Sequence, residues 1–179
     1  MGTTTYSWTN DNLLTGLNIS SGIGDVPTFT ATNSGTAPVV STITVTPSYD
    51  NGGVICTGPS ETYTITVNPV AQVNAQAPQT VCNGDSTSLT FTTVNTVGLT
   101  TYTWTNSNTS IGLPASGTGS IPTFIASNLT GTPVVANITV TPNFTNDGLS
   151  CSGPSETITI TVNPSGQVVQ PVSEVVCNG

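Results

Sequence analysis

Residues 151–164 read CSGPSETITITVNP, and residues 56–69 read CTGPSETYTITVNP. In both stretches a Gly-Pro-Ser turn signal is followed by strict alternation of threonine with an apolar or aromatic residue. Alternation with a period of two is typical of a β-strand that buries one face. We therefore expect the threonines to face water and the apolar residues to face inward, at Ile158, Ile160 and Val162.

The same spacing of 95 residues relates further blocks, so the chain is written nearly twice. These blocks are residues 26–29 with 121–124, 43–47 with 138–142, and 81–84 with 176–179. Only the earliest block differs, because Trp8 and Trp104 are 96 residues apart. A period near 95 is the size of an immunoglobulin-like sandwich and too long for a helical solenoid unit.

The second copy predicts an all-β fold of Greek-key β-sandwiches, one per repeat. Alternating runs indicate strands at residues 80–82, 88–93, 102–106, 122–127, 134–142 and 156–163. Turn signals separate them at residues 83–85, 117–119, 131–133 and 146–148. Besides the three residues above, the inward positions are Leu89, Phe91, Tyr102, Trp104, Ile138 and Val140.

The repeat predicts three segments. Residues 1–69 form a first repeat that lacks its N-terminal strands, residues 70–164 form a complete second repeat, and residues 165–179 form a linker with the first strand of a third. We favour a window of a long tandem array. The alternative is that a neighbouring chain supplies the missing strands. The tail has no counterpart of Leu89 and Phe91, which weakens that alternative.

The charge excludes several classes of function. The chain has no Lys, Arg or His and eight Asp or Glu, for a formal net charge of −8. Without cations it has nothing to bind nucleic acid or an acidic membrane surface. Without His, and with its carboxylates scattered singly, it is not expected to be an enzyme or to hold a cofactor. No apolar run is long enough for direct membrane insertion.

The four cysteines recur as two kinds, and no CxxC or Cys/His grouping for zinc exists. In an extracellular chain disulfides are expected. Cys82 with Cys151 is the pairing within one repeat, and it leaves Cys56 and Cys177 to partners outside this window. An immunoglobulin-like layout would place Cys82 and Cys151 toward opposite ends of the repeat, which would leave all four as free thiols.

Two acidic turns are weak calcium candidates, at Asp50 and Asp147, although Asp-Asn-Gly sequences are more often plain turns. A carbohydrate platform would need exposed aromatic rings. The aromatic residues are repeat-equivalent at strand positions, which favours core roles for them. They are Tyr6 and Tyr102, Trp8 and Trp104, Phe29 and Phe124, and Tyr49 and Phe144, with Tyr63 matching Ile158.

Four blocks, at residues 81–84, 102–106, 110–119 and 138–142, resemble the PKD-like repeats of giant Bacteroidota surface adhesins, with those of gliding motility the nearest. The resemblance implies tandem Ig/PKD-like sandwiches, export by type 9 secretion and a stalk or filament at the cell surface. It carries over no catalytic residue. Residues 85–87, Asp-Ser-Thr, are similar to an O-glycosylation acceptor of that phylum, so Ser86 is a glycosylation candidate, although a simple turn is favoured.

These observations favour a non-enzymatic structural repeat of a secreted adhesin stalk or surface filament. Its expected partners are neighbouring repeats or identical chains. The first alternative is a carbohydrate-binding adhesive module, whose partner is a surface polysaccharide. The second is a self-assembling filament subunit completed by strand exchange between chains.

Overall fold

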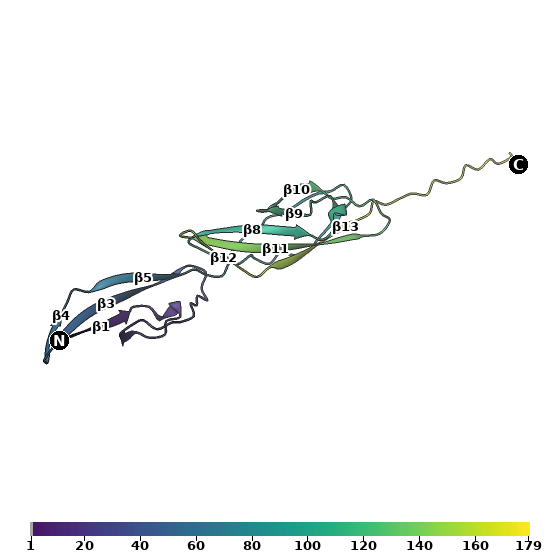
Figure 1. The fold of residues 1–179 in the computed structure, drawn as a ribbon. Helices are drawn as coiled ribbons and strands as arrows, with labels where there is room; N and C mark the ends of the chain where they lie inside the picture. Colours follow the sequence, from purple (N-terminus) through teal and green to yellow (C-terminus); the bar gives the residue numbers. More distant parts are fainter. Residues whose placement is uncertain (1) are drawn as a thin grey trace. The chain divides into compact units, whose positions relative to one another are not determined.

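Alternating threonine and apolar residues favour strands, and strands make up nearly all regular structure of the chain (Figure 1). In the computed structural model, which describes residues 2–179, thirteen strands are joined by loops and by two one-turn 3-10 helices. The predicted all-β class is confirmed. Within the described residues no helix is long and apolar enough to cross a membrane.

The first copy forms one five-stranded antiparallel sheet. Its central strand, β3, pairs with three others, and the order is β2-β1-β3-β4 with β5 also on β3. The bounds are β1 (Thr3–Asn10), β2 (Ser21–Ile23), β3 (Val39–Asn51), β4 (Val54–Thr57) and β5 (Glu61–Val67). The 3-10 helix η1 (Leu13–Thr15) follows β1.

The second copy repeats this arrangement and adds three strands. The six-stranded sheet has the order β6-β13-β11-β8-β9, with β12 also on β11, and β7 pairs with β10 in a separate sheet. The bounds are β6 (Gln79–Cys82), β7 (Ser86–Leu89), β8 (Leu99–Asn106), β9 (Ser116–Thr118), β10 (Ile121–Ile125), β11 (Val134–Asn146), β12 (Leu149–Ser152) and β13 (Glu156–Asn163), with η2 (Thr109–Ile111) after β8.

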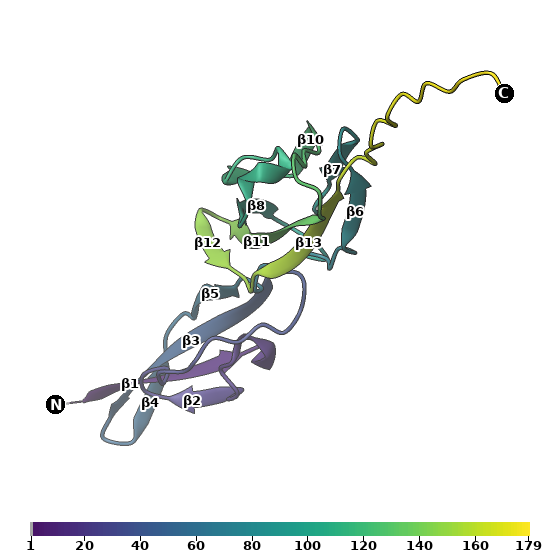
Figure 2. The ribbon, with the colours of Figure 1, turned by 90° about the vertical axis from the view of Figure 1, so that its right-hand side faces the viewer.

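One strand pair is parallel. β6 runs beside β13 in the same direction, with Val81 opposite Val162 and Cys82 opposite Asn163 (Figure 2). The other strand pairs with a printed register are antiparallel. The first and last strands of the second copy are therefore parallel neighbours.

Chain contacts divide the molecule into two compact units. One contains the residues up to Asn74 with Phe91–Tyr102 and Thr141–Ser155, and the other contains Ala75–Thr90, Thr103–Val140 and Glu156–Gly179. The sequence boundaries at 69/70 and 164/165 remain predictions.

Most inward positions predicted for the second copy are buried. Tyr102 is half-buried, and the rest are at most 5% exposed: Leu89, Phe91, Trp104, Ile138, Val140, Ile158, Ile160 and Val162. Two strands escaped prediction, β9 and β12. The turn expected at residues 117–119 is partly strand, because Gly117 has no side chain and lies against the indole ring of Trp104.

The loop after β1 and the loop after β8 are each held by a buried asparagine. The Asn106 amide donates to the carbonyl oxygens of Leu113 (2.9 Å) and Pro114 (3.3 Å). Asn10, at the equivalent position, donates to the carbonyl oxygens of Leu17 and Ile19. Because a buried carbonyl without a partner is costly, these two amides fix the loops that cover each tryptophan.

Replacing Asn106 with alanine should therefore destabilise the second copy by about 1–3 kcal/mol, since buried carbonyls lose their donor. Urea unfolding followed by tryptophan fluorescence measures this. Asn10→Ala should have a similar effect in the first copy. The control is Thr103→Ala on the exposed face of β8, which should change little. Equal stabilities for Asn106→Ala and Thr103→Ala would contradict this account.

Candidate functional site

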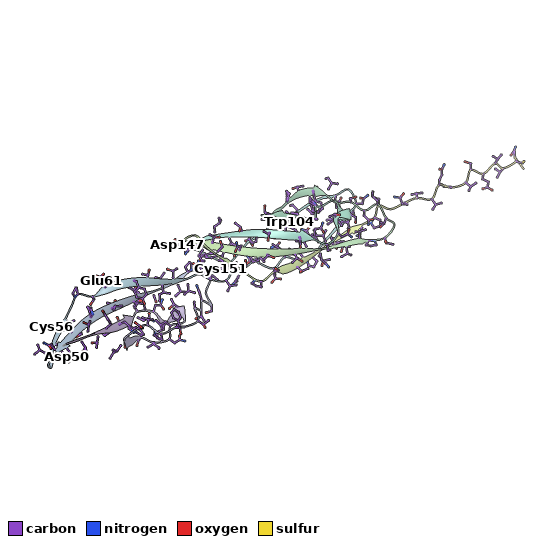
Figure 3. The ribbon with its side chains drawn as sticks, in the orientation of Figure 1. Asp50, Cys56, Glu61, Trp104, Asp147 and Cys151 are labelled. Carbon is purple, nitrogen blue, oxygen red and sulfur yellow. The ribbon has the colours of Figure 1, made fainter. Side chains whose placement is uncertain are left out.

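The calcium candidates, Asp50 at the end of β3 and Asp147 in the turn after β11, are labelled in Figure 3, and both accept hydrogen bonds. Asp50 is the second-last residue of β3, opposite Ile55 of β4, and its Oδ1 accepts from the backbone amide of Gly53 in the β3–β4 turn (2.9 Å). Asp147 follows β11, and its Oδ2 accepts from the Asn146 side chain (3.3 Å). Within residues 2–179 no group of three or more His, Cys, Asp or Glu side chains is gathered that could hold a metal ion. Calcium binding by Asp50 or Asp147 stays a prediction.

Cys82 and Cys151 do not form the predicted disulfide, and all four cysteines carry free thiols. Cys82 pairs with Asn163, the last residue of β13, whereas Cys151 lies in β12, which precedes β13. The eight residues of β13 span about 26 Å, whereas a disulfide allows about 6 Å between Cα atoms. The strand layout thus separates the two thiols. Bonds from Cys56 and Cys177 to outside partners stay a prediction.

Ser86, the glycosylation candidate, is exposed at the start of β7. Its neighbour Asp85 closes the turn from β6, because Asp85 Oδ2 accepts from the Cys82 amide (2.9 Å) and the Asp85 amide donates to the Cys82 carbonyl (3.1 Å). The Asp-Ser-Thr motif therefore has a structural role in this turn. Glycosylation of Ser86 stays a prediction.

The expectation that the aromatic residues lie in the core is wrong for three tyrosines of the first copy. Tyr6, Tyr49 and Tyr63 are about half exposed, whereas Phe144 and Ile158, the equivalents of the last two, are buried. Phe91, which precedes β8 in the second copy, has no equivalent among residues 2–179.

Phe91 lies against Tyr102, with ring centroids 5.6 Å apart and planes inclined at 56°. Burial raises the pKa of Tyr102 above its ordinary value of 10, while a hydrogen bond with Thr93 lowers it in part. The first copy offers Tyr6 at the equivalent place without a Phe91 to cover it. In the second copy Phe91, which precedes β8, thus packs on the Tyr102 ring.

The structure brings together a site at the residues that follow β5 and precede β6. We call residues 68–74 the junction segment. Its residue Ala71 is fully buried, and a Cβ atom on Gly153 would overlap the Ala71 carbonyl. The side-chain amide of Asn146 donates to Asn68 Oδ1 (3.1 Å), and the side-chain amide of Asn68 donates to the Asn146 backbone carbonyl (3.4 Å). The segment is therefore packed and hydrogen-bonded.

Asn95 fixes the middle of the junction segment. Its Oδ1 accepts from the Gln72 amide (2.7 Å), and its Nδ2 donates to the Val70 carbonyl (3.1 Å). Asn74 continues the contact through its backbone and side-chain amides, which donate to Thr92 O and Oγ1 (both 2.8 Å). One side chain thus satisfies backbone groups that a loose linker would leave to water.

A signal for part of this site was present in the sequence. Gly153 and Asn146 recur 95 residues earlier as Gly58 and Asn51, which marks both positions as structural. Asn95 has no earlier counterpart in the chain, so no comparison of copies could single it out.

Comparison with known proteins gave no match: no family model, no curated protein and no solved structure was similar to the chain. Function is therefore inferred from the chain's own residues and contacts.

Gly153→Ala should destabilise the chain by about 1–3 kcal/mol, because the new methyl group would displace the Ala71 backbone. Gly58→Ala is the matched control, since there the nearest atom is Cγ of the Pro47 side chain. Urea unfolding measures both stabilities, and hydrogen exchange at the Gln72 amide reports on the segment itself. Similar losses in both variants would show that Ala71 packing is not the cause.

Proposed function

We propose that this chain is a non-enzymatic structural part of an extracellular stalk, made of tandem immunoglobulin-like sandwiches that hold an adhesive region away from a cell surface. The 95-residue repeat and the resemblance to Bacteroidota adhesin repeats support this proposal. That resemblance also favours secretion by the type 9 system. Neighbouring repeats or identical chains are the expected partners.

The parallel pairing of β6 with β13 is the observation that carries the proposal. β6 begins the second copy and β13 ends it, and the two strands run in the same direction side by side. A pull on the preceding chain and on the following chain acts on the two strands in opposite directions along a common axis. Their hydrogen bonds are then loaded together, in shear, and cannot break one after another.

The junction segment supports the same role. Its backbone is held by Asn95, and its Ala71 is buried. A pull from the first copy therefore meets packed residues before it reaches β6. In a spacer this arrangement limits extension under low force.

The absence of cationic residues from the sequence also suits an exposed stalk. Proteases that cut after Lys or Arg find no site in this chain. Threonine covers strand faces that other proteins cover with charge, and it keeps strand propensity without paired ions.

Force spectroscopy tests the mechanical role. A chain pulled through residues 75 and 164 loads β6 and β13 in shear, and the unfolding force of the second copy should be high. Pulling the same chain through residues 84 and 164 loads these two strands from the same end, so that they peel apart. We expect the unfolding force to be several-fold lower in this geometry.

Equal unfolding forces in the two geometries would mean that the β6–β13 ladder carries no load, and the proposal would lose its main support. A glycan array with the whole chain tests the carbohydrate-binding alternative. Micromolar binding to a polysaccharide there would favour an adhesive module over a spacer.

A further inference from the structure

The strand β5 of the first copy has one free edge. Its equivalent β13 pairs with β11 on one side and β6 on the other, whereas β5 pairs only with β3 among the described residues. The difference shows in burial. Ile160 and Val162 of β13 are fully buried, but their equivalents Ile65 and Val67 of β5 are half-buried.

In the second copy β6 pairs with the free side of β13, and the turn after β6 makes further contacts. We call β6 with this Asn-Gly turn, residues 79–84, the docking element. After β6, Asn83 and Gly84 dock on the same sheet edge and on the loop that follows β10. The backbone amide of Asn83 donates to the Asn163 carbonyl (2.9 Å), and the backbone amide of Gly84 donates to the Ala126 carbonyl (2.8 Å). The backbone amide of Asn128 in turn donates to Asn83 Oδ1 (2.8 Å).

The first copy keeps three of the residues that receive this docking element. Asn163, Ala126 and Asn128 correspond to Asn68, Ala31 and Asn33. A fourth, Ser165, whose Oγ accepts from the Asn83 side chain (3.1 Å), is replaced by Val70. Asn33 also keeps the local role of its equivalent. The side-chain amide of Asn33 donates to the Val67 carbonyl, and that of Asn128 donates to the Val162 carbonyl, both at 2.7 Å. Much of the receiving surface is thus formed in the first copy, and no strand of residues 2–179 pairs with its β5 edge.

The chain carries a second version of the docking element, in its C-terminal segment. Residues 174–179 read EVVCNG, against QTVCNG at residues 79–84. The C-terminal segment, residues 165–179, follows β13 and extends away from it without strand partners among residues 2–179 (Figure 1, yellow). Its apolar side chains are 77–96% exposed, at Val168, Val169, Val172, Val175 and Val176.

We infer that residues 174–179 of one chain dock on the β5 edge of a second, identical chain, in parallel with β5, and so join chains head to tail. The register follows from the second copy, where Thr80 lies opposite Thr161 and Val81 opposite Val162. Val175 then lies opposite Thr66, and Val176 opposite Val67. The backbone amide of Asn178 then donates to the Asn68 carbonyl, and the backbone amide of Asn33 donates to Asn178 Oδ1.

Gly166 adds a second point of contact. It corresponds to Ala71, whose backbone packs on Gly153, and the equivalent of Gly153 in the receiving chain is Gly58. The docked residues 174–179 correspond to β6 and its Asn-Gly turn, so they close the β5 edge.

Disulfide trapping in a chain whose four cysteines are replaced with serine tests the register. In Thr66→Cys/Val175→Cys the two side chains are neighbours on the outer face of the docked pair. We expect covalent dimers and longer ladders on oxidation, with a 66–175 linkage in the peptide map. Thr80→Cys/Thr161→Cys is the positive control, and it should give the intramolecular bond of the known pair.

The matched negative control is Thr66→Cys/Val176→Cys, one residue out of register, where the two side chains point to opposite faces. If it cross-links as well as Thr66→Cys/Val175→Cys, the register is wrong. A 66–175 bond found only within single chains would show that each tail folds back on its own β5, and this would overturn head-to-tail docking. Chains that stay unlinked while the positive control closes would overturn it too.

Sedimentation of the chain with its native cysteines reduced gives an independent test. The average mass should rise with concentration, and Val176→Pro should weaken association at least ~10-fold, because proline removes an amide from the docked strand. Val172→Pro, outside residues 174–179, is the control. Equal association of the two variants would contradict the inference. A monomeric chain would still leave the mechanical role of the second copy intact, so the two proposals fail separately.

Discussion

A chain without lysine, arginine or histidine has no cationic side chain for an ion pair and fixes its loops with hydrogen bonds. Asparagine does most of this, because its short side chain carries both donors and an acceptor. Asn10 and Asn106 hold the loops that cover the tryptophans, and Asn33 and Asn128 bind the last strand of each copy. Asn95 does the same for the junction segment. Each of these asparagine side chains bonds to backbone groups of a loop, a strand end or the junction segment. These bonds therefore form only when the neighbouring strands end at the right residues.

The two copies show how far a strand depends on its partner. Residues 121–125 form β10 beside β7, whereas the equivalent residues 26–30 are irregular, although both stretches contain Pro-Thr-Phe. Nothing among the described residues pairs with 26–30 as β7 pairs with β10. The local sequence therefore permits a strand, and cross-strand pairing decides whether one forms.

Strands with a long alternating pattern could be predicted from the sequence, together with their buried residues, such as Ile158 and Ile160. Short strands could not, because β9 is built of Ser, Gly and Thr and owes its place to the ring of Trp104. Repeat equivalence predicted a core position for Tyr63 that only the second copy provides. The docking of the junction segment depends on contacts between residues far apart in sequence, and no local pattern encodes these.

The parallel edge strand links the mechanical proposal to head-to-tail docking. Within the second copy a pull shears β6 against β13, because one strand is held from its start and the other from its end. A tail docked in parallel on β5 of another chain is held in the same way, since its own chain precedes it and the receiving chain continues after β5. Junctions between chains would thus be loaded in the same direction as the ladder inside each chain. The covalent connection is absent there, and the register of residues 174–177 has to supply the resistance that the backbone supplies elsewhere.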